Sequence, residues 1–159
     1  ALKFLEEWRD IHGGLGRIMV CQLALATHKK TTKASVRKSL KTWLELRHEL
    51  DIVRDYPITH YHKRFNNAAY YWLFGHYFAL RAANFNGKGK VEDEARETIL
   101  AVLMQDKEKD GTWLGHHSFG PLCGTAQALM IFGEFDAPWR LPHGAGPKEK
   151  PITPSESRE

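Results

Sequence analysis

The chain has 159 residues, of which 42% are hydrophobic and 26% charged, a composition typical of one soluble globular domain. This composition excludes a collagen-like, fibrous or wholly disordered chain, and no apolar run approaches the roughly 18 residues of a transmembrane helix. The formal net charge of +4 is a mild excess, which argues against a nucleic acid as the partner.

Hydrophobic periodicity indicates helices along nearly the whole chain. A glycine-rich turn over 12–16 leads into a strongly apolar helix over 17–26, which we expect to be buried. The next helix can be capped by Thr31 or Thr32, and its apolar positions keep helical spacing to about Val53. The first half of the chain is therefore predicted to contain a helical hairpin.

A proline-containing segment over 56–59 ends that helix. A further helix is expected from Asn66 or Asn67 to Ala83, and aromatic residues on most of its sides predict that most of its faces are buried. After a loop with two glycines, an amphipathic helix is expected over 91–105, with acidic residues in its first turn.

The last predicted helix begins near Pro121 and runs to about Phe132, where Gly133 is expected to end it. The tail over 137–159 is rich in proline and charge, so we expect it to be disordered or laid along a surface. The sequence therefore predicts an all-α fold, with paired helical hairpins in a domain over 1–136.

Two cysteines and one basic helix face bear on the environment of the chain. Cys21 and Cys123 lie in apolar stretches and are too few for a disulfide framework, so we expect buried free thiols and favour a reducing compartment. Lys33, Arg37 and Lys41 are four residues apart on one predicted helix. We expect a solvated helix face there, and contact with phospholipid head groups or nucleic acid is the alternative.

A pattern recurs along the chain at intervals of about 50 residues. Its members are the segments 20–25, 70–75 and 125–130, each preceded by a second series at Phe4-Leu5, Trp43-Leu44 and Leu100-Ala101. A helical hairpin repeated at this spacing is typical of stacked helix pairs, in which each pair covers the apolar face of its neighbour.

Gln105, Gly111 and Trp113 follow one another at the spacing of a known repeat motif. The stretch resembles the glutamine–tryptophan repeat of squalene–hopene cyclases and their relatives, in which Gly-any-Trp follows a Gln after a short loop. Leu100-Ala101 is a weaker match to the aromatic-aliphatic pair that precedes the Gln, and the two earlier repeats are degenerate. The resemblance implies an α/α toroid, in which inner and outer helices surround an apolar cavity, and this chain holds about half of such a ring.

The wider family includes triterpene cyclases, prenyltransferase β subunits and complement-like thioester domains, and their motifs are incomplete in this chain. It lacks the Asp-any-Asp-Asp acid of the cyclases and the adjacent Glu-Gln of the thioester domains. Cys123 lies close to His116 and His117, a set that can bind zinc. Because the family's zinc ligands cannot be placed on matching positions, we expect no metal or cofactor, with zinc as the alternative.

Aromatic and histidine side chains supply the candidates for a ligand cavity. They are Tyr70, Tyr71, His76, Tyr77, His116 and His117. An aromatic stripe at helical spacing also suits a core helix, and His76 also suits a hydrogen-bonded core histidine. We expect a concave, aromatic-lined face that binds an apolar small molecule or a protein partner, in a ring completed by a further chain or another copy. The alternative is part of a terpene cyclase or prenyltransferase whose remaining catalytic residues lie outside this chain, and no catalytic residue is assigned here.

Overall fold

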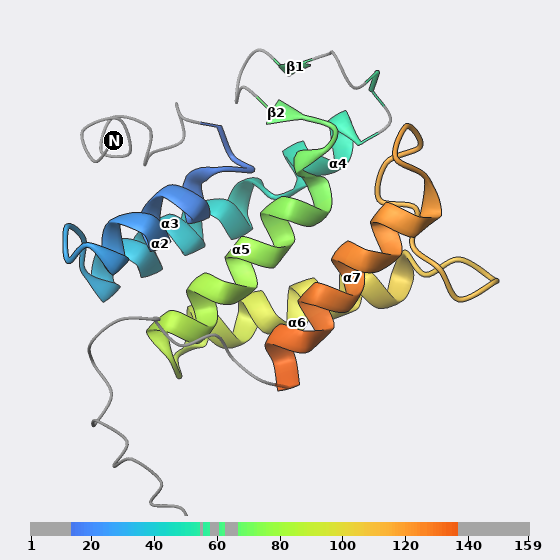
Figure 1. Ribbon diagram of the computed structural model, residues 1–159. Helices are drawn as coiled ribbons and strands as arrows, with labels where there is room; N and C mark the ends of the chain where they lie inside the picture. The colour runs from blue at the N-terminus through green and yellow to red at the C-terminus, as the bar shows by residue number, and fades with distance from the viewer. Residues whose placement is uncertain (1–13, 55, 58–60, 63–66, 137–159) are drawn as a thin grey trace, which may run out of the picture.

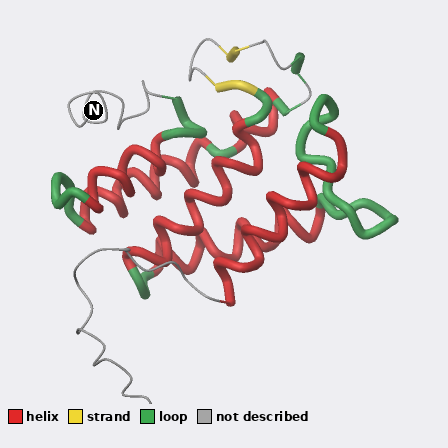
Figure 2. The backbone as a smooth tube through the Cα atoms, viewed as in Figure 1, coloured by secondary structure: helices red, strands yellow, loops and turns green. Residues whose placement is uncertain are grey.

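The computed structural model describes residues 14–54, 56–57, 61–62 and 67–136, and this part of the chain is mainly helical (Figures 1 and 2). Its helices are α2 (Ile18–Thr27), α3 (Lys33–Leu46), α4 (His48–Val53), α5 (Tyr71–Asn86), α6 (Lys90–Gln105) and α7 (Gly120–Asp136). A two-residue antiparallel ladder pairs β1 (Tyr61–His62) with β2 (Asn67–Ala68). The predicted all-α class is confirmed. The predicted tail over 137–159 and the Phe4-Leu5 pair lie outside the described residues.

The helices form two layers, and α5 lies in the middle of one of them (Figure 1). One layer consists of α2, α5 and α7, with α5 in contact with both of its neighbours. The other consists of α3 and α6, which contact each other and pack against α5. The three segments of the sequence repeat therefore lie in the first layer, and Trp43-Leu44 and Leu100-Ala101 lie in the second. Closure of such an array into a toroid stays a prediction.

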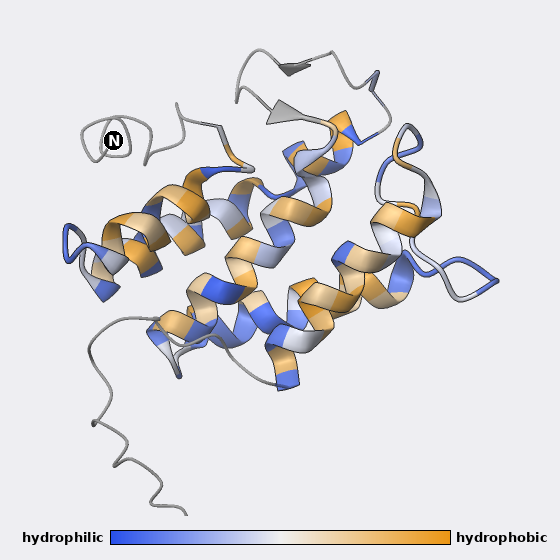
Figure 3. Cartoon of the chain, viewed as in Figure 1, coloured by the Kyte–Doolittle hydropathy of each residue, from blue (hydrophilic) through white to orange (hydrophobic). Residues whose placement is uncertain are grey.

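The helices of the two layers differ in how their apolar residues are distributed around the helix. Val36, Leu40 and Trp43 form the buried stripe of the amphipathic helix α3, whereas α2 and α7 show apolar residues over most of their visible surface (Figure 3). Thr32 caps α3, since its hydroxyl accepts a hydrogen bond from the Ser35 N–H at 3.2 Å. An amphipathic helix needs only one covered face, so α3 and α6 suit the outside of the array.

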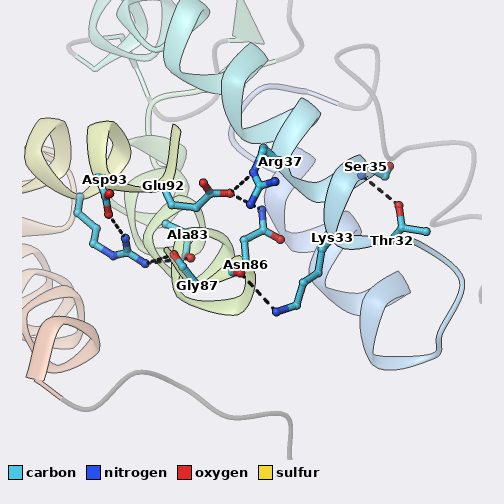
Figure 4. A network of polar contacts seen from close by, with 10 residues as sticks. Thr32, Lys33, Ser35, Arg37, Ala83, Asn86, Gly87, Glu92 and Asp93 are labelled. Carbon is cyan, nitrogen blue, oxygen red and sulfur yellow. Dashed lines mark hydrogen bonds and ion pairs between the residues drawn. The ribbon is translucent and has the colours of Figure 1, made fainter. Parts of the chain in front are cut away.

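An ion pair between the exposed Arg37 and a buried carboxylate fastens the α5–α6 turn to α3 (Figure 4). The side chain of Glu92 is 0% exposed, and its carboxylate accepts hydrogen bonds from Arg37 Nε at 2.6 Å and Asn86 Nδ2 at 2.9 Å. Burial alone would raise the pKa of Glu92, but these donors outweigh it and lower the pKa below its usual value. Lys33 Nζ also donates to the Asn86 carbonyl at 3.3 Å. The turn is thereby held beside the first turns of α3.

Arg54, which follows α4, fastens the loop between α6 and α7. Its guanidinium pairs with both carboxylate oxygens of Asp106, and its Nε donates to the Gly115 carbonyl at 3.3 Å. The guanidinium also lies 4.2 Å from the centre of the Trp72 ring, and the indole N–H of Trp72 donates to Asp51 at 2.8 Å. These contacts join α4, α5 and the loop.

The helices predicted over 17–26 and 91–105 agree with α2 and α6, whereas the other three predicted helices have wrong boundaries. The helix expected to continue to Val53 is interrupted at Arg47, between α3 and α4. The aromatic helix begins later than predicted, because Asn67 belongs to the β1–β2 ladder, and it ends later than predicted, at Asn86. Gly133 does not end the last helix and lies inside α7. None of the described helices combines the length and apolar character that crossing a membrane requires.

Candidate functional site

The central helix α5 presents a row of aromatic rings on its less buried side. Phe74, Tyr77 and Phe78 recur at the spacing of one helix face and are only partly buried. The ring centroids of Phe74 and Phe78 are 4.7 Å apart, and those of Tyr77 and Phe78 are 5.0 Å apart. Tyr71 extends the row, with its ring centroid 5.7 Å from that of Phe74. The guanidinium of Arg17 lies 5.6 Å from the centre of the Tyr71 ring. We refer to Tyr71, Phe74, Tyr77 and Phe78 as the aromatic row.

A groove with a volume of about 240 Å³ runs between the aromatic row and α7. It is lined by Leu73, Phe74, Tyr77, Phe78, Gln127 and Met130. The lining is apolar apart from the Gln127 amide and the Tyr77 hydroxyl. Small-molecule pockets usually enclose about 300–1,000 Å³, so the groove suits one apolar segment of a ligand rather than a large molecule as a whole.

A polar cluster joins α5 to α7 one helical turn beyond the groove. Arg81 Nε lies 3.4 Å from a Glu134 carboxylate oxygen, and Arg81 Nη1 donates to the Tyr77 hydroxyl at 3.0 Å. The hydroxyl of Tyr77 donates to the same carboxylate at 3.4 Å, and Asn84 Nδ2 donates to the Glu134 carbonyl at 2.8 Å. The side chains of Arg81 and Glu134 are only 15% and 9% exposed. The cluster therefore places paired charges at one end of an apolar groove.

His76 lies on the opposite face of α5, inside the core. Its ring is 1% exposed, and Nδ1 donates to the Trp72 carbonyl at 2.7 Å. The ring centroid lies 5.0 Å from that of Trp72 and 5.2 Å from that of Trp43. Burial lowers the pKa of His76 to about 4. This candidate is therefore a neutral core histidine, separate from the groove.

Because of His76, we expect the free energy of unfolding to fall as the pH is lowered through the range between 6.5 and 4. The unfolded chain takes up a proton near the ordinary pKa of about 6.5, whereas the folded chain resists protonation down to about 4. This contribution to stability is complete above pH 6.5, and by pH 5 we expect a loss of about 2 kcal/mol. Urea denaturation at pH 7.5, 6 and 5 measures the loss.

The matched variants for this measurement are His76→Leu and His117→Leu, since the first removes the buried imidazole and the second an exposed one. His76→Leu should lose most of the decline in stability between pH 7.5 and 5, and His117→Leu should keep it. A wild-type stability that stays constant over this range would contradict the assignment of a buried neutral imidazole.

His116 and His117 lie in the loop that precedes α7. His116 is 4% exposed, and its Nε2 donates to the Tyr56 carbonyl at 2.9 Å. Its Nδ1 accepts a hydrogen bond from the Ser118 N–H at 3.1 Å, so both ring nitrogens are already engaged. His117 is exposed, with its ring centroid 4.2 Å from that of His116.

A small cavity brings Tyr70, His116, Cys123 and Gln127 to the same place between α5 and α7. Its volume is about 10 Å³, which holds a single water molecule at most. Cys123 is a partly exposed free thiol, and its sulfur accepts a weak hydrogen bond from Gln127 Nε2 at 3.8 Å. Cys21 is a buried free thiol, and burial raises its pKa. Among the described side chains, no three potential ligands of His, Cys, Asp or Glu type come together as a metal site would require.

The repeat-motif residues lie where α6 leads into the next loop. Trp113 is 7% exposed, and its indole N–H donates to the Leu103 carbonyl near the end of α6 at 2.7 Å. Its ring meets that of Phe132 on α7, with centroids 5.5 Å apart. Gly111 has a positive φ of 88° in the turn, and Gln105 is exposed at the last residue of α6. The tryptophan thus joins two helices of the array.

Comparison of the chain with protein-family models, with curated proteins and with solved structures finds no match. The resemblance to cyclase repeats therefore rests on the motif residues alone, and the assignment of a function rests on the groove.

Tyr77 is the one predicted cavity residue that lines the groove, and Phe74 and Phe78, which lie beside it there, were not among the predicted residues. The spacing of Phe74 and Phe78 relative to Tyr71 would have placed them on the same face of the helix. The pairing of Arg81 with Glu134 had no signal of its own in the sequence, because the two residues are far apart along the chain.

Proposed function

We propose that this chain is a toroid-type helical repeat domain that binds an apolar ligand in the groove beside the aromatic row. The observation that carries this proposal is the groove itself, whose lining from α5 and α7 is apolar although it faces solvent. A soluble domain gains nothing from exposing such a surface, and contiguous apolar patches mark sites of interaction. Each methylene group buried there contributes about 0.8 kcal/mol.

The expected ligand is an acyl or isoprenoid chain with a polar head group. The chain would lie along Phe74 and Phe78, which offer flat, partly exposed rings. The head group would lie near the Tyr77 hydroxyl, which already exchanges hydrogen bonds with Arg81 and Glu134. An isoprenoid-type enzyme remains the alternative, with its catalytic residues outside this chain, and a protein partner would use the same groove.

The test fills the groove with a larger side chain and measures binding of cis-parinarate, a fluorescent fatty acid. Met130→Trp should weaken binding at least tenfold, because the indole occupies the space that the acyl chain needs. The matched control is Leu129→Trp, since Leu129 is 60% exposed against 53% for Met130 and does not line the groove. The control should bind the probe as the unmodified chain does.

Two results would contradict the proposal. One is the absence of saturable cis-parinarate binding by the folded chain. The other is equal binding by the two tryptophan variants, which would place the probe somewhere other than the groove.

A further inference from the structure

The first hairpin carries an unusually one-sided charge. Residues 11–44 include seven lysines and arginines but no aspartate or glutamate. In the described part of this stretch, the lysines of the α2–α3 turn and of α3 are all exposed. Positive charge is therefore concentrated in this hairpin, although the net charge of the whole chain is modest.

A second hairpin turn adds to this concentration. Lys33 reaches the Asn86 carbonyl, and Arg37 reaches the buried Glu92, so the α5–α6 turn lies beside the start of α3 (Figure 4). Lys88 and Lys90 in and after that turn are exposed. We call this surface the basic end, and its residues are Lys29, Lys30, Lys33, Lys88 and Lys90.

The charges of the basic end are not neutralised locally. None of its five lysines forms an ion pair with a residue that the structure describes. Of the carboxylates that follow the α5–α6 turn, Glu92 is buried against Arg37 and Asp93 pairs with Arg96 at 2.7 Å, while Glu94 lines a pocket together with Lys90 but forms no ion pair with it. Clusters of four to eight basic residues are attracted to anionic lipids, and the basic end gathers five lysines from two turns, the start of α3 and the start of α6.

We propose that the basic end binds the surface of a membrane rich in anionic phospholipid. The lysines come from two turns and one helix face at the same end of the array, so several of them can approach one charged plane together. The buried stripe of α3 faces the core, so binding is electrostatic and needs no insertion of the helix. The proposal is independent of the ligand proposed for the groove, because the two surfaces share no residue.

A lipid surface fits better than a nucleic acid. Binding of single strands uses exposed aromatic rings on which bases stack, and Phe85, next to Lys33 at this end, is only partly exposed and packs against the core. Reading of duplex DNA needs an element that enters a groove, whereas the basic end is formed by two short turns and the side of one helix. The basic end therefore lacks the features that recognise bases, and its lysines suit electrostatic attraction to the charged surface of a lipid bilayer.

The experiment is co-sedimentation of the full chain with vesicles of phosphatidylcholine and phosphatidylserine in equal amounts. Binding should be absent with phosphatidylcholine alone and should disappear between about 0.05 M and 0.5 M salt. The double variant Lys30→Gln with Lys88→Gln removes one charge from each turn and should weaken binding at least tenfold, since each lysine near such a surface contributes about fivefold.

The matched control is Lys107→Gln with Lys109→Gln, which removes the same charge from the exposed α6–α7 loop. Its vesicle binding should stay within about threefold of the unmodified chain, and circular dichroism should show that both variants are folded. The proposal is overturned if anionic vesicles do not bind, if the two double variants weaken binding equally, or if a DNA oligonucleotide displaces the chain from vesicles at equal concentration of phosphate.

Discussion

Gly124→Ala is expected to lower the free energy of unfolding by about 3 kcal/mol or more. A Cβ atom at this position would lie 2.2 Å from the Trp113 carbonyl oxygen and 2.5 Å from the backbone of Leu114. Both obstacles are main-chain atoms, which cannot rotate away as a side chain can. The start of α7 would have to move off the preceding loop, and urea denaturation measures the loss.

Gly133→Ala is the matched control in the same helix. Apart from the chain neighbours and the backbone of α7 itself, no atom lies within 4 Å of a Cβ atom at this position, and Gly133 is exposed. Alanine should therefore stabilise the chain by about 0.5–1 kcal/mol, because glycine is a poor helix former. If Gly124→Ala proved as stable as the unmodified chain, the close approach of α7 to the loop would be wrong.

Trp113→Ala is expected to destabilise the chain by about 3–5 kcal/mol. The substitution removes a large side chain that is only 7% exposed and deprives the Leu103 carbonyl of its hydrogen-bond donor. It also leaves Phe132 without its aromatic neighbour. The shift of the urea midpoint at constant slope gives the magnitude.

Two further variants separate the parts of this effect. Trp113→Phe keeps an aromatic ring but not the N–H, so it should lose about 1–3 kcal/mol. Leu122→Ala, at a side chain that is 86% exposed in the neighbouring helix, should change stability by less than about 0.5 kcal/mol. An unchanged melting temperature for Trp113→Ala would refute its role as the tryptophan that joins α6 to α7.

Local sequence signals predicted the helices well where the ends carry their own stop signals. α2 and α6 agree with prediction because glycine turns and a change of periodicity bound them. The end of α7 was missed because contacts beyond Gly133 sustain the helix. Glu134 pairs with Arg81, and Phe135 packs against the core, and neither contact between distant parts of the chain is visible in a local pattern.

The candidate site was predictable only in part for the same reason. The aromatic composition of α5 predicted an apolar surface, but composition alone did not distinguish the core-facing side of the helix from the side that lines the groove. Periodicity separates them, because Trp72, His76 and Ala79 recur on the core side, while the aromatic row recurs on the other. The share of α7 in the groove, through Gln127 and Met130, depends on packing between helices that only the fold reveals.

The position of α5 has a consequence for how the molecule unfolds. In an open stack of repeats each unit contacts only its neighbours, so terminal units can unravel one by one. Here α5 contacts α2, α3, α4, α6 and α7, so a single helix takes part in most of the helix–helix interfaces of the described array. We therefore expect one cooperative transition. Because the same helix forms one wall of the groove, the amide hydrogens beneath the aromatic row should exchange only when the whole domain opens.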